Sequence, residues 1–165
     1  QALQDEGRAN AMKLGKSLKM TLQSAMKSGG PVAAVKVCNS SASPIAEKVT
    51  AETDWAVGRT SLKLRNPDNA PDEWELAVLN KFEERKVAGE SPKTLEYGET
   101  VMVDGKETFR FMKAIPTDKV CMNCHGGDQV KAEVAELIKQ LYPDDKARGY
   151  KPGDLRGAFT LSKTL

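Results

Sequence analysis

The stretch TLEYGETVMVDGKETFRFMKAI, residues 94–115, carries the clearest strand signal in the chain. Two runs rich in β-branched and aromatic residues flank Asp104-Gly105, the dipeptide typical of a two-residue hairpin turn. In the register that this turn sets, Glu99 faces Arg110, so opposite charges pair across the strands. The stretch therefore predicts an antiparallel β-hairpin.

Helical patterns lie on both sides of the hairpin in the sequence. Residues 71–89 place Trp74, Val78 and Phe82 on one face of a helix, and residues 130–141 form a second amphipathic pattern that stops before a proline. Two further strands are predicted. One lies within the extended stretch at residues 54–71, and the other is DLRGAFTLSK at residues 154–163.

The N-terminal part of the chain is predicted to be helical throughout. Leucines recur at helical spacing over residues 3–27, and Gly29-Gly30-Pro31 ends that run. Two shorter helices are expected after it, over residues 31–42 and 43–53, with Ser43 as the N-cap of the second.

These elements predict an α+β fold with an antiparallel sheet and flanking helices. The chain shows no internal repeat and no linker long enough to separate two folding units. We therefore expect one domain over residues 1–165, with a long N-terminal helix at 1–30 and the remaining core at 31–165.

Composition limits the classes of partner. The 25 basic and 23 acidic residues are interspersed, the net charge is +2, and no basic stripe is visible, so a nucleic-acid partner is not expected. No apolar stretch approaches the roughly 20 residues of a membrane-spanning helix.

The segment VCMNCHGG, residues 120–127, contains a Cys-x-x-Cys-His motif, and His125 is the only histidine in the chain. In a c-type haem site the thiols of Cys121 and Cys124 bond to the porphyrin, and the adjacent histidine binds the iron. A zinc site would need four ligands, yet only Cys38 remains outside the motif, and a redox dithiol would be expected in a βαβ pattern. The motif therefore predicts one covalently bound haem c.

A haem would also suit the hairpin, because both of its faces are partly apolar. Such a sheet is covered on both sides, and we expect helices on one side and a flat haem on the other. The first face carries Leu95, Tyr97, Val101 and Met112, and the second carries Met102, Phe109 and Phe111.

The second axial ligand of the iron is left open by the residues alone. Methionine is the usual partner of histidine in electron-transfer cytochromes c, but most methionines here lie in helical or strand patterns, where packing is their ordinary role. Cys38 is the one thiol without an assigned role, and it could be a small buried hydrophobic residue or a thiolate on the iron. The candidates are Met12, Met20, Met26, Met102, Met112, Cys38, a lysine, or no side chain.

Four segments resemble a family of single-haem PAS-like domains of unknown function: VCNSSASPIAEKV (37–49), GRTSLKLRNPDNAPDEWE (58–75), CMNCHGG (121–127) and GYKPGDLRGAFTL (149–161). Members of that family occur as small exported haem proteins and as extracytoplasmic sensor regions of bacterial signalling proteins. The resemblance implies a PAS-like antiparallel sheet with a helical N-terminal portion. It also implies a cysteine opposite the histidine, which by motif position is Cys38.

An anionic thiolate stabilises ferric iron more than ferrous iron, so ligation by Cys38 predicts a low potential and a weaker iron–sulfur bond after reduction. Carbon monoxide or nitric oxide could then bind the ferrous haem, which describes a redox or gas sensor with a signalling output module. A periplasmic electron carrier with a redox partner protein is the alternative. No enzymatic role is expected, because the chain offers no second histidine for acid–base chemistry.

Covalent haem attachment takes place outside the cytoplasm in bacteria, so we expect an extracytoplasmic location, with an export signal or anchor that this chain does not show. The long N-terminal helix could pack in a homodimer, although covering its own domain is the default expectation.

Asn66 is interpreted as a loop residue. Arg59 and Arg65 are either loop residues or partners of a haem propionate.

Overall fold

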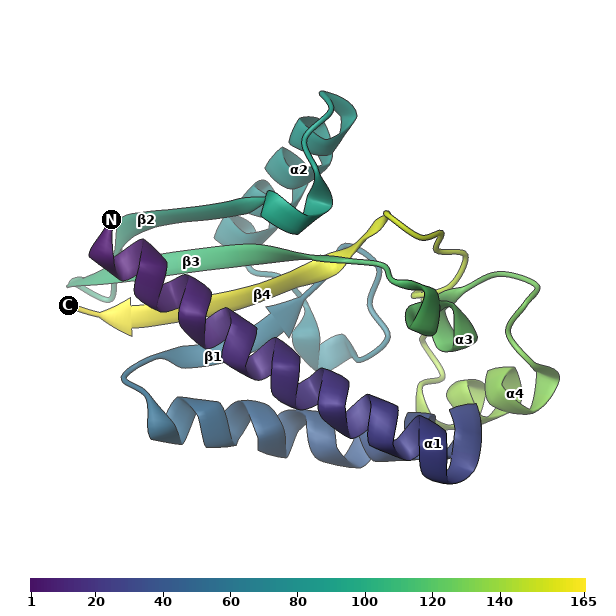
Figure 1. The fold of residues 1–165 in the computed structure, drawn as a ribbon. Helices are drawn as coiled ribbons and strands as arrows, with labels where there is room; N and C mark the ends of the chain where they lie inside the picture. Colours follow the sequence, from purple (N-terminus) through teal and green to yellow (C-terminus); the bar gives the residue numbers. More distant parts are fainter.

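The computed structural model describes residues 1–165 and confirms the α+β fold class (Figure 1). Four antiparallel strands form one sheet in the order β1-β4-β3-β2. The strands are β1 (Ala56–Thr60), β2 (Glu96–Val103), β3 (Lys106–Pro116) and β4 (Leu155–Thr164). The helices are α1 (Ala2–Glu52), α2 (Glu73–Val87), α3 (Met122–His125) and α4 (Ala132–Leu141).

The predicted hairpin is β2 and β3, and its register is confirmed. Asp104 and Gly105 both adopt positive φ angles, 49° and 77°, as a two-residue turn with the right twist requires. Glu99 lies opposite Arg110, as expected. The turn chemistry and the cross-strand charges are local signals, which is why they suffice to set this pairing.

Helix α1 is broken once. Gly30 has φ 71° and ψ −164°, so the predicted end of the N-terminal helix at this glycine is confirmed. Beyond it, the second half of α1 runs back beside the first (Figure 1). The predicted boundary between residues 42 and 43 is wrong, because the helix continues through Ser43 and Pro44. A proline removes only one helical hydrogen bond, so without a glycine beside it the helix can bend and continue.

The first half of α1 lies on one face of the sheet through small residues. A Cβ atom added to Gly7 would stand 2.9 Å from Cγ of Phe111, and one added to Gly15 would stand 2.9 Å from Cζ of Phe159. Ala11, between the two glycines, is fully buried. These three positions recur every four residues, so they form a single stripe that brings the helix backbone close to the aromatic rings of the sheet.

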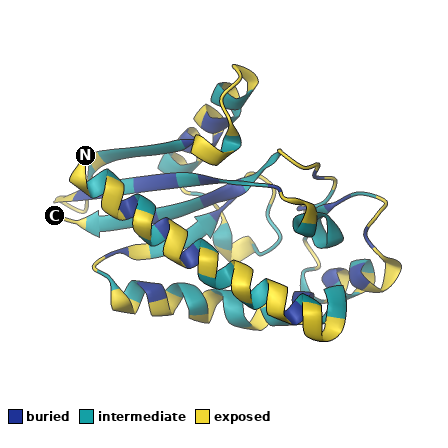
Figure 2. Cartoon of the chain, in the orientation of Figure 1, coloured by how far each residue is buried: buried dark blue, intermediate teal, exposed yellow.

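Helix α2 covers the opposite face. Val78 and Phe82 are buried there, as predicted, and Trp74 packs against them. Both faces of the sheet are therefore covered by helices, and β3 and β4 contain its most buried stretches (Figure 2). The expectation that a flat haem covers one face is wrong, because the small residues of α1 occupy that face instead. No helix combines the length and hydrophobicity needed to cross a bilayer.

The end of the sheet remote from the hairpin turn is where α3, α4 and the Gly30 end of α1 meet (Figure 1). Val35 of α1 packs there with Val130, Val134 and Ile138 in a third apolar cluster. This cluster holds the Cys-x-x-Cys-His motif beside the second half of α1.

The stripe gives a direct test of the helix–sheet contact. Replacing Gly7 with valine would push a branched side chain into the Phe111 ring, and we expect a loss of about 1–3 kcal/mol in the free energy of unfolding, measured by urea denaturation. Gly58→Ala is the matched control, because its nearest neighbour, a methyl carbon of Thr160, would be 3.9 Å away. Equal stability of the two variants would contradict the close approach of α1.

Candidate functional site

The Cys-x-x-Cys-His motif forms one continuous helical turn. Residues Lys119–Cys121 are a 3-10 turn that leads directly into α3, and the side chain of Asn123 donates to the carbonyl of Val120 at 3.0 Å. Cys121 and Cys124 are free, half-buried thiols three residues apart, a spacing that places both on the same side of a helical turn. His125 follows immediately.

The His125 ring is held in a defined tautomer. Nδ1 lies 2.9 Å from the carbonyl oxygen of Ala147, and because a carbonyl only accepts, Nδ1 must carry the proton. Nε2 is then an acceptor, and Nε of Arg156 donates to it at 3.4 Å. Burial and the nearby charge of Arg156 lower the pKa of His125 well below its ordinary value, so the ring is neutral.

A neutral imidazole anchored through Nδ1, with an acceptor Nε2, is the form in which histidine binds a metal. Together with two thiols on the same turn, it is also the donor set of a c-type haem site. The residues present therefore fit this prosthetic group. Cys121 and Cys124 would hold it covalently, and His125 would bind its iron.

Arg65 clamps the motif to two other segments. Its guanidinium donates to the carbonyl of Cys124 at 2.8 Å and to that of Ala147 at 3.0 Å, and it pairs with Asp145 at 3.0 Å. Both charged side chains are nearly buried, with exposed fractions of 11% for Arg65 and 9% for Asp145. Of the two roles left open for Arg65, the structure therefore shows the structural one.

The segment after α4 also anchors the motif. The backbone amide of Tyr150 donates to the carbonyl of His125 at 2.9 Å, and that of Gly149 donates to Gly126 at 3.1 Å. The Arg148 side chain adds a further bond to Gly126 at 3.0 Å. The sequence interpretation did not identify Arg148 or Tyr150 as site residues, because their partners lie more than twenty positions away and leave no local pattern.

Cys38 lies in the same neighbourhood. Its side chain has access to solvent, yet the surrounding protein crowds the sulfur enough to raise the pKa of the thiol, an effect that the positive charges of Arg59 and Arg65 oppose. Cys38 also contributes to the raised pKa of Cys124. The structure thus brings the third cysteine toward the motif. Its ligation of an iron stays a prediction.

The methionine candidates are mostly accounted for by other roles. Met112 is fully buried in the core beneath α2, as expected of a packing residue. Met102 lies next to the hairpin turn, at the end of the sheet opposite the Cys-x-x-Cys-His motif. Met12 and Met20 are exposed on α1. Met26 is half-buried near the Gly30 end of α1. Among these candidates, it is the one whose position is explained neither by exposure to solvent nor by packing in the core.

Asn66 is a loop residue, as predicted. Its side chain accepts a hydrogen bond from the backbone amide of Asp68 at 3.0 Å and so caps a short 3-10 turn at Pro67–Asn69. This turn follows the clamp residue Arg65 directly.

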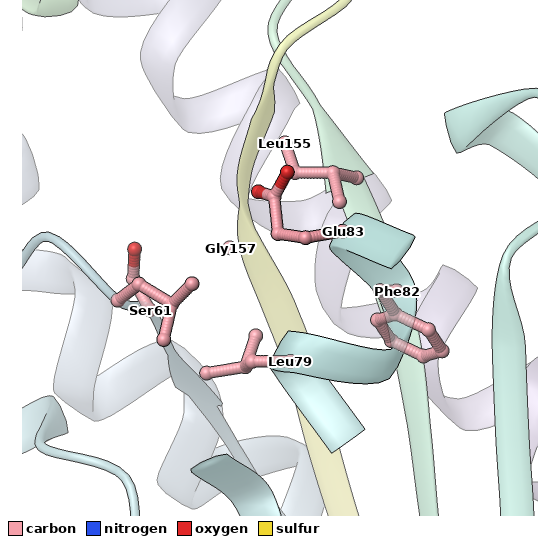
Figure 3. Close-up of a pocket in the computed structure, with 7 residues that line it drawn as sticks. Ser61, Leu79, Phe82, Glu83, Leu155 and Gly157 are labelled. Carbon is pink, nitrogen blue, oxygen red and sulfur yellow. The ribbon is translucent and has the colours of Figure 1, made fainter. Parts of the chain in front are cut away.

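Two cavities lie away from the motif. One, between α2 and β4, has a volume of about 20 Å³ and is lined by Ser61, Leu79 and Phe82 among others (Figure 3). It has room for about one water molecule. The other, about 200 Å³, is an open hollow beside Gly58 and Arg110. Ligand pockets usually measure about 300–1,000 Å³, so neither cavity is a second candidate for a large prosthetic group.

The clamp predicts a large effect of mutation. Arg65→Met would leave Asp145 buried without its cation, and we expect a loss of about 3 kcal/mol in the free energy of unfolding, measured by urea denaturation. Arg85→Met is the control, because the Arg85–Glu90 pair is more exposed and should cost less than about 1 kcal/mol. An Arg65 variant as stable as the Arg85 variant would show that the clamp does not hold the motif.

Comparisons with known proteins support the fold and show the family of this chain. The fold matches a solved structure described as "Crystal structure of the cyanobacterial heme-protein Tll0287", with a TM-score of 0.70 and 23% sequence identity, covering 97% of this chain and 96% of that chain. A comparison with curated proteins finds no match. The family model described as Tll0287-like matches residues 1–163, which is nearly the whole chain. This chain therefore belongs to the Tll0287-like family.

Proposed function

We propose that this protein is an extracytoplasmic c-type haem protein that acts as a redox sensor. One haem c would be attached to Cys121 and Cys124, with His125 and Cys38 as the axial ligands. The observation that carries the proposal is the state of His125, which is neutral, anchored through Nδ1 to Ala147, and on the same helical turn as two free thiols. The description of the related Tll0287 as a haem protein supports the same cofactor.

Cys38 is the residue that favours a sensor over an electron carrier. When bound, the haem supplies an iron centre that accepts and donates one electron. A Cys38 thiolate stabilises the oxidised state, because its negative charge offsets the higher positive charge of that state. A Cys38 thiolate would be held less strongly by a reduced iron, and its sulfur would then take up a proton from solvent. The raised pKa of the Cys38 thiol favours this protonation.

Because Cys38 lies on α1, its release from the iron could change the position of this helix. Cys38 lies in the second half of α1, and Gly30 separates this half from the first half, which lies on the sheet. A glycine with positive φ at a helix break can absorb a change in backbone angles. Release of Cys38 would therefore allow the second half to shift while the first keeps its contact with Phe111. A signalling output module is the partner that this motion would serve.

The ligand assignment can be tested by low-temperature EPR of the haem-loaded ferric protein. We expect a low-spin signal with the narrow spread of g values that thiolate ligation gives, and its loss in Cys38→Ala. Met26→Leu is the control and should keep the wild-type signal. A wide spread of g values in the wild type, or a high-spin signal, would remove Cys38 from the iron and leave an electron carrier or an open gas-binding site.

Gating by Cys38 has a kinetic consequence. We expect carbon monoxide to bind the reduced Cys38→Ala variant faster than the wild type, by about tenfold for each 1.4 kcal/mol that displacing Cys38 costs. Stopped-flow mixing with carbon monoxide, followed by haem absorbance, measures the rate, and Met26→Leu again serves as the control. The same rate and affinity in wild type and Cys38→Ala would count against gating by this cysteine.

A further inference from the structure

Two arginines beside His125 have no carboxylate partner. Arg156 in β4 donates through Nη1 to the hydroxyl of Ser61 at 3.1 Å and to the carbonyl of Lys63 at 3.3 Å, and through Nε to Nε2 of His125. All three acceptors are neutral. Arg59 in β1 lies opposite Phe159 of β4 in the strand register. Its guanidinium makes neither a hydrogen bond nor an ion pair with any side chain.

These two guanidinium groups are also partly shielded from water, because both arginines are half-buried. Five other arginines are satisfied by protein groups. Arg8, Arg65, Arg85 and Arg110 pair with carboxylates, and Arg148 bonds to two backbone carbonyls. A pair of half-buried cations without anions carries a desolvation cost that an anionic ligand would offset.

We propose that Arg59 and Arg156 are positioning residues that bind the two propionate carboxylates of a haem. This inference rests on the proposed function, since haem brings two carboxylates to a site that offers two unpaired guanidinium groups. Guanidinium and carboxylate match as a bidentate pair, which fixes the orientation of a ligand as well as its charge. Arg65 is excluded from this role, because its charge is already paired with Asp145, and its Nε and Nη2 donate to Asp145 and to two carbonyls.

Arg156 has a second duty in this arrangement. Its Nε donates to Nε2 of His125, and this nitrogen has a single lone pair that a hydrogen bond and a metal cannot share. Arg156 must therefore leave His125 when the ring binds iron. The bonds from its Nη1 to Ser61 and Lys63 keep the guanidinium at the site. A small rotation of the side chain is then enough to move Nε from the neutral His125 ring to an anionic propionate.

The assignment predicts opposite effects in the haem-free and haem-loaded protein. Arg59→Met and Arg156→Met remove a half-buried charge that has no anionic partner in the haem-free chain, and we expect its urea midpoint to rise. In the haem-loaded protein the same changes remove a propionate partner, and we expect its midpoint to fall. Arg85→Met, which breaks an ordinary ion pair at a distance, should lower the midpoint of both forms by the same amount.

Resonance Raman spectroscopy of the haem-loaded variants supplies a second readout that does not depend on folding of the haem-free chain. Each methionine variant should shift the bending band of one propionate, and Arg59→Lys or Arg156→Lys should restore part of the shift. The proposal is overturned if the propionate bands match the wild type and the midpoints fall equally in both forms. The intact mass of the exported wild type distinguishes failure of the arginine assignment from failure of the proposed function. A chain without bound haem would refute the proposed function itself.

Discussion

The close contact between the first half of α1 and the sheet is the constraint on which the other features depend. Gly7, Ala11 and Gly15 bring the helix backbone onto Phe111 and Phe159, so one sheet face is filled by a helix and not by a ligand. The same contact directs α1 along the sheet toward its far end. The break at Gly30 occurs there, and the chain returns with Cys38 near the Cys-x-x-Cys-His motif.

At that far end, the short helix α3 depends on other segments for its hydrogen bonds. The last carbonyls of any helix lack partners within the helix, and here three successive ones are satisfied from outside. Arg65 donates to Cys124, the amide of Tyr150 to His125, and Arg148 to Gly126. Two of these donors are guanidinium groups, whose positive charge suits the negative end of a helix. The motif is thus held by its backbone, which leaves the two thiols free to react.

Local signals were enough to predict part of this structure. The Asp104-Gly105 turn and the charge pairs set the hairpin register, and the Cys-x-x-Cys-His spacing indicated the candidate site. Other features depend on contacts between distant residues. A pattern of large apolar residues does not reveal the glycine stripe, because glycine has no side chain to count. The N-cap signal at Ser43 was also misleading, because α1 continues through this residue. The partners of Arg65 are 59, 80 and 82 positions away, and those of Arg156 are 31, 93 and 95 away, so no sequence pattern marks them.

Both chain termini lie at the hairpin-turn end of the sheet, where the amide of Leu165 donates to the carbonyl of Glu107 (Figure 1). Strand β3 has 11 residues, and at about 3.3 Å each it separates this end from the motif by roughly 35 Å. Electron tunnelling over such a length is negligible compared with direct contact at α3. A haem bound at this motif, as proposed, would therefore exchange electrons poorly with an electrode tethered through either terminus and readily with one attached near α3.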